Sequence, residues 1–240
     1  MRRLLIADVH ANLPAFEAVL RDAGAVDEVI FLGDIVDYGP HPAQCVDLLR
    51  SLGARAVVGN HDLQVLAVAP CTDAPQEPVN WLQWTCRQLS DAHLAYIAGL
   101  PAELSVRTMD GGDEFRALHR PAGAPYLHPA MSDAELAQHC RSAPGPFVVF
   151  GHSHRPIDRT VGGRRLVCLP PVGQPRDGDP RAGYALQTGG TLSFHRVAYD
   201  VESVIADVCA IGLDPAFTAR WVEFLRTGFD DEWSQSYRPG

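Results

Sequence analysis

The sequence predicts an α/β fold, and three observations lead to this prediction. Short apolar runs with the length of buried strands recur along the chain. Over the first part of the chain, the runs at 3–7, 28–32 and 55–58 alternate with segments that have helix-start and helix-stop residues. Residues that can bind metals follow directly on several runs. Right-handed crossovers would bring the carboxyl ends of such strands to one edge of a sheet.

The two connections between the first three runs are expected to be helices. Asn12 is a favourable N-cap, Pro14 lies in the first turn, and Gly24 ends the first helix. The second helix is predicted from about Pro42 to Leu52, because Gly53 follows as a stop signal. The alternation of strands and helices then implies that the three strands are parallel.

The segment from Leu63 to about Leu104 has no strand pattern, and its large apolar side chains recur mostly at helical spacings. These side chains are Trp81, Trp84, Leu89, Leu94, Tyr96 and Leu100. We therefore expect a helical cap that packs over the sheet.

The second half of the chain returns to strand patterns. Strands are predicted at 114–118, 147–150, 158–161, 164–169, 184–187 and 191–197. The pairs Gly162-Gly163 and Gly189-Gly190 are typical of tight hairpin turns. Ser132 and Glu135 form a capping-box pattern that opens a helix between two of these strands. Two helices and a polar tail are expected at the end of the chain.

Composition limits the class of protein. The 240 residues contain no linker-like stretch, so we expect one domain over 1–240 with the cap inserted at about 63–104. A formal net charge of -9 disfavours nucleic-acid and acidic-membrane partners, because polyanions repel such a surface. No apolar stretch approaches the ~18 residues of a membrane span. The six cysteines include no Cys-x-x-Cys pair, which favours reduced thiols. We expect a cytoplasmic protein.

Four clusters of metal-binding residue types follow apolar runs. Asp8 and His10 come after LLIA, Gly33-Asp34 after VIFL, residues 59–62 (Gly-Asn-His-Asp) after RAVV, and residues 151–154 (Gly-His-Ser-His) after FVVF. Mixed imidazole and carboxylate ligands suit divalent transition metals, and two such ions a few ångströms apart suit the hydrolysis of a phosphoester. The candidate ligands are Asp8, His10, Asp34, Asn60, His119, His152 and His154.

Some of these residues have simpler interpretations. Asp8 and Asp34 could be helix caps, an interpretation that their histidine neighbours disfavour. His119 has no motif of its own and could be a solvated loop residue. Its position after a predicted strand favours it over His128 and His139 as a ligand.

The order D-x-H, G-D-x-x-D, G-N-H-D, H, G-H-x-H, which extends from Leu4 to Arg155, resembles the calcineurin-like metallophosphoesterase superfamily. The resemblance implies a four-layer α/β/β/α sandwich of two mixed sheets. It also implies two divalent ions, with Mn²⁺ the first choice and Fe, Zn or Ni as alternatives. A metal-bridging hydroxide would attack phosphorus directly, without a phosphoenzyme.

The resemblance also implies a role for each motif residue. One ion would be bound by Asp8, His10 and His154, and the other by Asn60, His119 and His152. Asp34 would bridge the two ions. His61 is similar to the proton donor of the family, and Asp37 resembles the carboxylate that orients it, with Asp62 as the alternative partner.

Further motifs are similar to a bacterial subgroup, the YfcE-like or diadenosine-tetraphosphatase-like phosphoesterases. They include Trp84-Thr85 with Leu89-Ser90, and the stretches 172–177 and 196–200. The Pro/Gly-rich segment 170–183 is either a rigid surface connection or a border of the pocket, where Arg176 could hold a phosphate. Arg120, where small relatives have glycine, is a second candidate for phosphate binding.

The expected activity is hydrolysis of phosphodiester or phosphoanhydride bonds in a small, nucleotide-type substrate. A phosphomonoesterase or protein phosphatase of the same superfamily is the alternative. Tyr38 and Asp62 stand where protein phosphatases carry Arg and Glu, which disfavours that assignment. A non-catalytic metal-binding scaffold is a third possibility, disfavoured because every motif residue is present.

Overall fold

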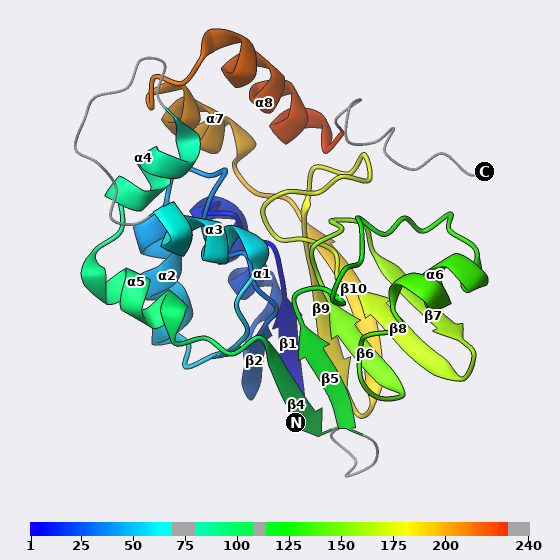
Figure 1. The fold of residues 1–240 in the computed structure, drawn as a ribbon. Coiled ribbons are helices and arrows are strands. Elements are labelled where there is room, and N and C mark those ends of the chain that lie inside the picture. Colours follow the sequence, from blue (N-terminus) through cyan, green and yellow to red (C-terminus); the bar gives the residue numbers. More distant parts are fainter. Residues whose placement is uncertain (69–79, 108–113, 230–240) are drawn as a thin grey trace.

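The computed structural model describes residues 1–68, 80–107 and 114–229. Two five-stranded mixed sheets pack face to face, with helices on their outer sides (Figure 1). The strand orders are β10-β9-β1-β2-β3 and β4-β5-β6-β8-β7. This arrangement confirms the predicted four-layer α/β/β/α sandwich.

The first sheet contains the strands β1 (Arg2–Ile6), β2 (Glu28–Phe31), β3 (Arg55–Ala56), β9 (Ala182–Thr188) and β10 (Thr191–Val197). β1, β2 and β3 are parallel, as the alternation with helices predicted. β9 pairs antiparallel with β1, and β10 pairs antiparallel with β9. The turn between β9 and β10 has positive φ at both Gly189 and Gly190, as a tight hairpin requires.

The second sheet contains β4 (Glu103–Arg107), β5 (Glu114–Leu118), β6 (Phe147–Phe150), β7 (Ile157–Val161) and β8 (Arg164–Cys168). β5, β6 and β8 are parallel, and β4 and β7 are antiparallel edge strands. β4 was not predicted, and residues 103–104 belong to it rather than to a helical cap. Only Val106 of this strand is fully buried, so its apolar alternation is too short to be recognised, and its pairing with β5 decides the conformation.

The helices are α1 (Leu13–Ala23), α2 (Pro42–Ser51), α3 (Asn60–Val68), α4 (Trp81–Arg87), α5 (Asp91–Ala98), α6 (Asp133–His139), α7 (Val201–Cys209) and α8 (Pro215–Thr227). Asn12 caps α1, as predicted, by accepting a hydrogen bond of 3.2 Å from the backbone N–H of Ala15. Ser132 and Glu135 form the predicted capping box of α6. α7 and α8 pack together beyond the sheets (Figure 1).

The side chains of β1 alternate between the two faces of the first sheet and contribute to two hydrophobic cores. Leu4 and Ile6 point to the outer face, where they pack with residues of α1 and α2. Leu5 points to the inner face and packs with residues of the second sheet such as Phe115 and Val149. A separate core joins α6 to the outer face of the second sheet. Strands buried on both faces explain the continuous apolar runs.

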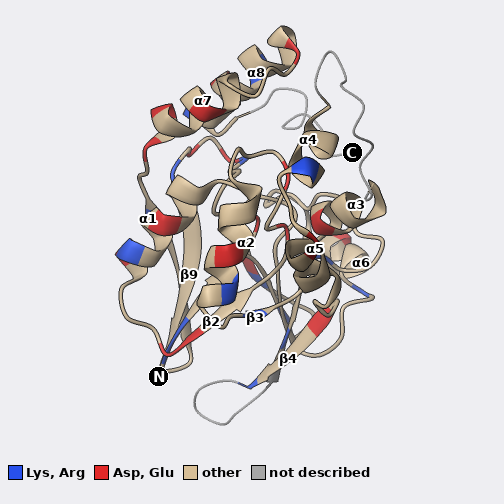
Figure 2. Ribbon diagram, turned by 90° about the vertical axis from the view of Figure 1, so that its left-hand side faces the viewer, with Lys and Arg blue, Asp and Glu red and all other residues tan. Residues whose placement is uncertain are grey.

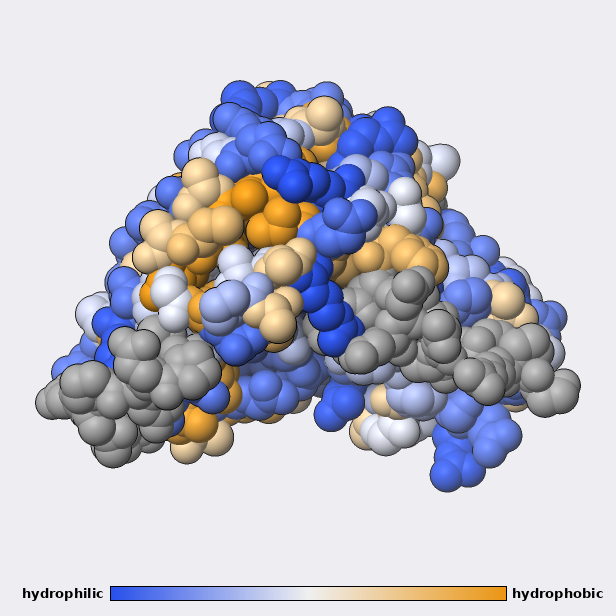
Figure 3. Space-filling model, turned by 90° about the horizontal axis from the view of Figure 1, so that it is seen from above, coloured by the Kyte–Doolittle hydropathy of each residue, from blue (hydrophilic) through white to orange (hydrophobic). Residues whose placement is uncertain are grey.

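Helices α3, α4 and α5 occupy the segment predicted as a cap, of which 69–79 lies outside the described residues. Ile97 of α5 is fully buried in the same core as α1 and α2, so α5 extends the helical layer over the first sheet. Trp81 at the start of α4 packs instead with α7 and α8. Figure 3, seen from the side of α7 and α8, shows apolar residues at the surface of this region.

The remaining features of the fold are its charged surface, its lack of a membrane-spanning helix among the described residues, and its cysteines. Acidic and basic residues are interspersed on the helical side of the first sheet (Figure 2). Of the helices in the described ranges, none combines the length and apolar character needed to span a membrane. None of the five described cysteines forms a disulfide, whereas Cys71 and the polar tail 230–240 lie outside the described residues.

Candidate metal centre

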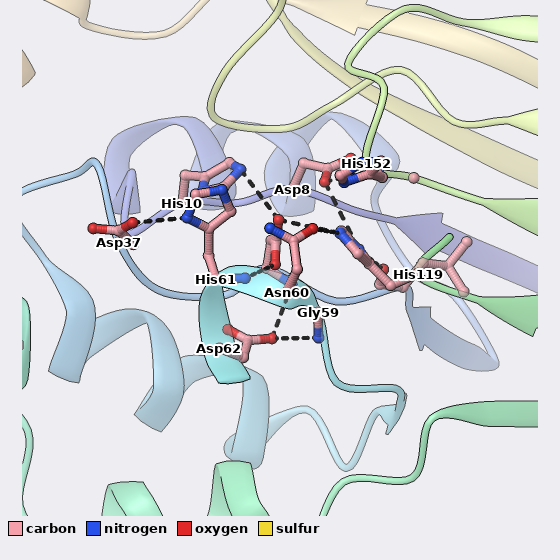
Figure 4. A network of polar contacts seen from close by, with 12 residues as sticks. Asp8, His10, Asp37, Gly59, Asn60, His61, Asp62, His119 and His152 are labelled. Carbon is pink, nitrogen blue, oxygen red and sulfur yellow. Dashed lines mark hydrogen bonds and ion pairs between the residues drawn. The ribbon is translucent and has the colours of Figure 1, made fainter. Parts of the chain in front are cut away.

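The seven predicted ligands meet in one network at the carboxyl ends of the strands. Figure 4 labels five of them: Asp8, His10, Asn60, His119 and His152. Asp8 and His10 follow β1, Asp34 follows β2, and Asn60 follows β3 as the first residue of α3. His119 follows β5, and His152 and His154 follow β6. The two sheets therefore both contribute side chains, because their parallel strands end at the same edge of the sandwich.

Four of these residues form the tightest group. Asp8, His10, Asp34 and His154 are buried, and each offers one ligand atom within 4.8 Å of the others. Nε2 of His10 lies 3.2 Å from Nε2 of His154 and 3.7 Å from Oδ2 of Asp34. Oδ1 of Asp8 lies 3.3 Å from Nε2 of His154. These atoms surround a space at which a cation can be bound.

Three further residues adjoin this group, namely Asn60, His119 and His152, of which His152 donates its backbone N–H to the carboxylate of Asp8 at 3.1 Å. Nε2 of His119 is 3.0 Å from Oδ1 of Asn60 and 3.2 Å from Oδ2 of Asp34. The rings of His119 and His152 have their centroids 5.3 Å apart. Oδ2 of Asp34 thus lies between His10 and His119, one from each group, which is the position that a bridging carboxylate needs.

Backbone carbonyls determine which histidine nitrogens face the site. Nδ1 of His119 lies 2.8 Å from the carbonyl oxygen of Leu32, and Nδ1 of His154 lies 2.6 Å from that of Gln174. A carbonyl oxygen can only accept, so each Nδ1 donates and each neutral ring directs the lone pair of Nε2 inward. The lone pair of His119 then faces oxygens of Asn60 and Asp34, an arrangement that a metal cation would stabilise.

Unsatisfied buried atoms support the same conclusion. Oδ2 of Asp34 and Nδ1 of His10 are buried and form no hydrogen bond within the described part of the chain. Such atoms are costly in a folded protein unless a ligand satisfies them. The donor set, the inward lone pairs and the orphaned carboxylate oxygen together fit a metal-binding Asp/His site.

Burial keeps most of the histidines in the form that binds metals. Burial, with the neighbouring charge of Arg176, holds the pKa of His154 well below its usual range. Burial also lowers the pKa of His10, and together with His119 it lowers that of His152 to about 3. His119 is the exception: burial alone would lower its pKa, but the charges of Asp34 and Asp8 raise it to about 9. A proton and a metal thus compete for His119.

The loops that carry these residues have an unusual backbone. Within the described ranges, eight non-glycine residues have positive φ, and all lie in the loops after β1, β2 and β6. They are Asp8, His10, Ala11, Asp34, Asp37, Tyr38, His152 and His154. Non-glycine residues in this region are strained, and such strain concentrates at functional sites.

His61 lies beside the metal-binding group and pairs with a carboxylate. Its Nδ1 is 2.7 Å from Oδ2 of Asp37, and its backbone N–H donates to Oδ1 of Asp34 at 2.8 Å. Burial tends to lower the pKa of His61, but the hydrogen bond to Asp37 and the charge of Asp34 outweigh it and raise the pKa. The geometry pairs His61 with Asp37 rather than with Asp62.

Asp62 instead holds the backbone of two loops. Its carboxylate accepts hydrogen bonds from the N–H groups of Asp34, Ile35 and Gly59 at 2.8–2.9 Å, and from Val36 at 3.3 Å. Burial and the charge of Asp34 raise its pKa to about 6. Asp62 therefore fixes the loop after β2 against the start of α3.

The first half of the Pro/Gly-rich segment 170–183 is buried and borders the site, whereas residues 177–181 lie at the surface. The N–H of Gly173 donates to the carbonyl of Asp8, and the carbonyl of Gln174 accepts from His154. Arg176 is 4% exposed and lies over the ring of Tyr126, 4.9 Å from its centroid. Arg120 is exposed and takes no part in this network.

Two residues of the site were missed from the sequence. Tyr126 stacks on His152 at 4.5 Å, in an irregular loop without a motif. Tyr38 packs its ring 4.7 Å from that of His61 and 5.4 Å from that of His10. The sequence placed Tyr38 where protein phosphatases carry Arg, which indicates a position at the site, but it did not indicate the packing of the ring against His61.

Comparison with known proteins identifies the class. The model of the calcineurin-like phosphoesterase superfamily domain matches residues 1–190, and the chain belongs to this family. It is therefore a metallophosphoesterase, a phosphoric ester hydrolase, by fold and site.

Some relatives match most of the chain, and others match only part of it. The chain is similar to a metallophosphoesterase structure from Sphaerobacter thermophilus (33% identity, TM-score 0.81, covering 95% of this chain and 99% of that one). It is 30% identical to the uncharacterized protein MJ0912 of Methanocaldococcus jannaschii over 82% of this chain and 88% of that protein. A symmetrical bis(5'-nucleosyl)-tetraphosphatase of Yersinia pestis is 35% identical over 35% of this chain and 36% of that enzyme. YfcE of E. coli is also a structural neighbour (19% identity, TM-score 0.49).

Proposed function

We propose that this protein hydrolyses phosphodiester or phosphoanhydride bonds of a small, nucleotide-type substrate with two divalent ions, of which Mn²⁺ is the first choice. The observation that carries the proposal is the His61–Asp37 pair, which lies directly beside the buried Asp/His group. A structural metal site needs no such neighbour, whereas ester hydrolysis needs a proton donor for the leaving oxygen.

In this proposal the seven ligands divide between the two ions as the family resemblance implies. Asp8, His10 and His154 would hold one ion, Asn60, His119 and His152 the other, and Asp34 both. When bound, the ions lower the pKa of coordinated water and neutralise the phosphoryl oxygens. The carbonyls of Leu32 and Gln174 keep His119 and His154 oriented toward the ions.

His61 acts as the general acid in this proposal. As water adds to phosphorus and the ester or anhydride bond breaks, the imidazolium of His61 gives its proton to the leaving oxygen. Asp37 keeps Nδ1 engaged, so that Nε2 is the nitrogen that donates. The hydrogen bond to Asp37 stabilises the protonated form of His61.

The substrate class rests on what the site contains and on one relative. The symmetrical bis(5'-nucleosyl)-tetraphosphatase that the chain resembles cleaves, by its name, a nucleotide-type substrate. Arg176, buried at the border of the site, is the candidate for binding a further phosphate, whereas the exposed Arg120 is less well placed. A phosphomonoesterase is the alternative, and a silent scaffold is disfavoured by the intact His61–Asp37 pair.

The test uses three variants with Mn²⁺ and two diesters, bis-p-nitrophenyl phosphate and an alkyl phosphodiester. His61→Ala should bind metal like the wild type yet lose at least about a hundredfold in kcat on the alkyl diester, because its strongly basic leaving oxygen needs a proton; the loss should be smaller for the p-nitrophenyl diester. Asp34→Asn should lose metal and activity together. His139→Ala, in α6 on the far side of the second sheet, is the control and should behave like the wild type. Full activity in His61→Ala on an alkyl phosphodiester would refute the general-acid assignment.

The preferred bond type is tested by comparing the rates at which three substrates are hydrolysed. A phosphomonoester, a cyclic nucleotide and diadenosine tetraphosphate are compared at equal concentration with Mn²⁺. We expect kcat/KM to be highest for the cyclic nucleotide or for diadenosine tetraphosphate. A preference for the monoester would favour the alternative function. If the protein binds metal but hydrolyses none of the three substrates, a non-catalytic scaffold is favoured.

A further inference from the structure

A surface cavity of about 390 Å³ lies beside the candidate metal centre and has no part in holding the metal. It is formed by the loop after β2, by α3, by the start of α4 and by the start of α8. Its lining includes Asp37, Tyr38, Asn80, Trp81, Asp214 and Phe217. The volume is within the range of about 300–1,000 Å³ that small-molecule sites occupy.

The position of the cavity relates it to the leaving group. Asp37 lines the cavity and also pairs with Nδ1 of His61, and Tyr38 lines it while packing against the ring of His61. The cavity is thus next to the group that is proposed to protonate the leaving oxygen. A leaving group that receives its proton from His61 can extend into this cavity, because Asp37 and Tyr38 contact both.

The walls are aromatic and are held rigidly. Phe217 and Tyr38 both stack on the buried ring of Trp221, with centroid distances of 6.2 and 5.2 Å. Trp81 packs edge-on against Trp221 at 5.7 Å and against Phe217 at 5.8 Å. Trp221 is 4% exposed, so it supports the three wall residues from behind. Rigid aromatic walls favour a planar ring that can stack.

The charges and hydrogen-bonding groups of the cavity further limit the kind of molecule that it can bind. The charged residues that line the cavity, Asp37 and Asp214, are both acidic, so a phosphate is repelled and only the non-phosphate part of a substrate fits. The amides of Gln64 and Asn80 and the carboxylate of Asp214 can hydrogen-bond to the edge of a heteroaromatic ring. A quaternary ammonium group would gain from the acidic residues but could not use the amides.

We propose that this cavity binds the nucleobase of the leaving group, stacked among Tyr38, Trp81 and Phe217. The inference rests on the proposed function, because it takes His61 as the proton donor for that group. It assigns a site to the aromatic part of the substrate, and it makes Phe217, which lies 63 residues after the last metal-motif residue His154, a determinant of specificity.

Binding of adenosine, which has no phosphate, tests the proposal independently of turnover. Adenosine is titrated into the full chain, with and without Mn²⁺, and binding is followed by tryptophan fluorescence excited beyond the adenine absorption. Adenosine should bind and should inhibit hydrolysis of bis-p-nitrophenyl phosphate competitively. Phe217→Ala should weaken adenosine binding about tenfold, the effect of losing one stacking partner. Phe217 is 38% exposed, so this variant should fold.

The control is Phe194→Ala, which removes a similarly exposed ring (36%) from β10, outside the cavity. It should leave adenosine binding unchanged, and choline should not bind to any form. The proposal is overturned if adenosine does not bind, or if it binds to Phe217→Ala as tightly as to the wild type. Choline binding that is lost in Phe217→Ala would also overturn it in favour of a cationic group.

The two proposals fail in different ways. If the protein hydrolyses no phosphoester but binds adenosine through Phe217, the cavity stands and the catalytic function falls. If hydrolysis follows the His61 prediction but adenosine does not bind, the catalytic function stands and the cavity proposal falls.

Discussion

Asp34 serves two purposes with its two carboxylate oxygens. Oδ1 accepts the backbone N–H of His61 and so fixes the start of α3. Oδ2 faces His10 and His119 and lacks a hydrogen bond within the described residues. Burial alone would raise the pKa of Asp34, but the charge of His119 lowers it well below its usual range. The carboxylate therefore stays ionised in the place where a cation would neutralise it.

Asp62 is the residue on which the geometry of Asp34 depends, and we predict a large effect for Asp62→Asn. The amide would place an N–H donor where two backbone N–H groups now donate to a carboxylate oxygen. The free energy of unfolding should fall by about 2–4 kcal/mol, and metal affinity should fall about tenfold or more. Urea unfolding and a metal titration measure the two effects.

The control for this variant is Asp91→Asn in the first turn of α5, which is exposed. Its stability should change by less than about 1 kcal/mol, with no change in metal affinity. Equal effects of the two substitutions would contradict the role given to Asp62.

Gly59 permits close contact between two loops, and we predict that Gly59→Ala damages the site. A Cβ at this position would overlap the backbone nitrogen and the carboxylate of Asp34. The overlap should cost about 1–3 kcal/mol of stability and should abolish activity, because Asp34 must move. Thermal unfolding and a diesterase assay provide the measurements.

Gly99→Ala is the control for Gly59→Ala, because it makes the same substitution away from the site. A Cβ there would lie 3.5 Å from the carbonyl oxygens of Ala95 and Tyr96, an ordinary contact. Activity should be retained in full, with a stability change within about 1 kcal/mol. If Gly59→Ala proved as active as Gly99→Ala, the tight apposition of the two loops would be unimportant.

At the scale of elements, short strands position the site and short helices are held by their caps. The loops after β1, β2 and β6 begin where the apolar run of each strand ends, so the strand ends determine where each ligand is placed. α6 is only seven residues long, too short to be stable by itself, and it depends on its capping box and on Leu136 packing against the second sheet.

We predict that Ser132→Ala destabilises the protein by about 1 kcal/mol, because the N–H of Glu135 loses its acceptor. Ser132→Thr keeps the hydroxyl and should remain within a few tenths of a kcal/mol of the wild type. Chemical denaturation with a fixed m-value measures both. Activity should be unchanged in each variant, because α6 lies on the outer face of the second sheet, away from the site.

At the scale of the whole molecule, the core between the two sheets holds the two halves of the site in place. Asp8, His10, Asp34 and Asn60 follow strands of the first sheet, whereas His119, His152 and His154 follow strands of the second. Each group of proposed ligands thus includes residues from both sheets. Any change in the packing of one sheet on the other would displace the ligands relative to one another.

Phe115 tests this dependence, because it is fully buried between the sheets. Phe115→Ala should lower the free energy of unfolding by about 3–5 kcal/mol and should weaken metal binding as well. Phe194→Ala, at the exposed margin of the same core on the edge strand β10, should cost less than about 1 kcal/mol and leave metal binding intact. Calorimetry with and without Mn²⁺ distinguishes the outcomes, and a loss of stability without any loss of metal affinity would show that the sheets position the ligands independently.

The sequence by itself determined the fold class, nearly all strands and helices, and the proposed ligand set. It could do so because buried parallel strands leave continuous apolar runs, and because ligands must follow such runs directly. The edge strand β4 was not predicted, because its conformation depends on pairing with β5.

Only the tertiary structure decided which partners these residues have. It paired His61 with Asp37, assigned Asp62 to the backbone of two loops, and placed the first half of the segment 170–183 against the site. It also brought Phe217 of α8 beside Tyr38 and Trp81 to form a cavity. Contacts of this kind join residues far apart in the chain, and no local pattern records them, because they arise only when separate elements pack together.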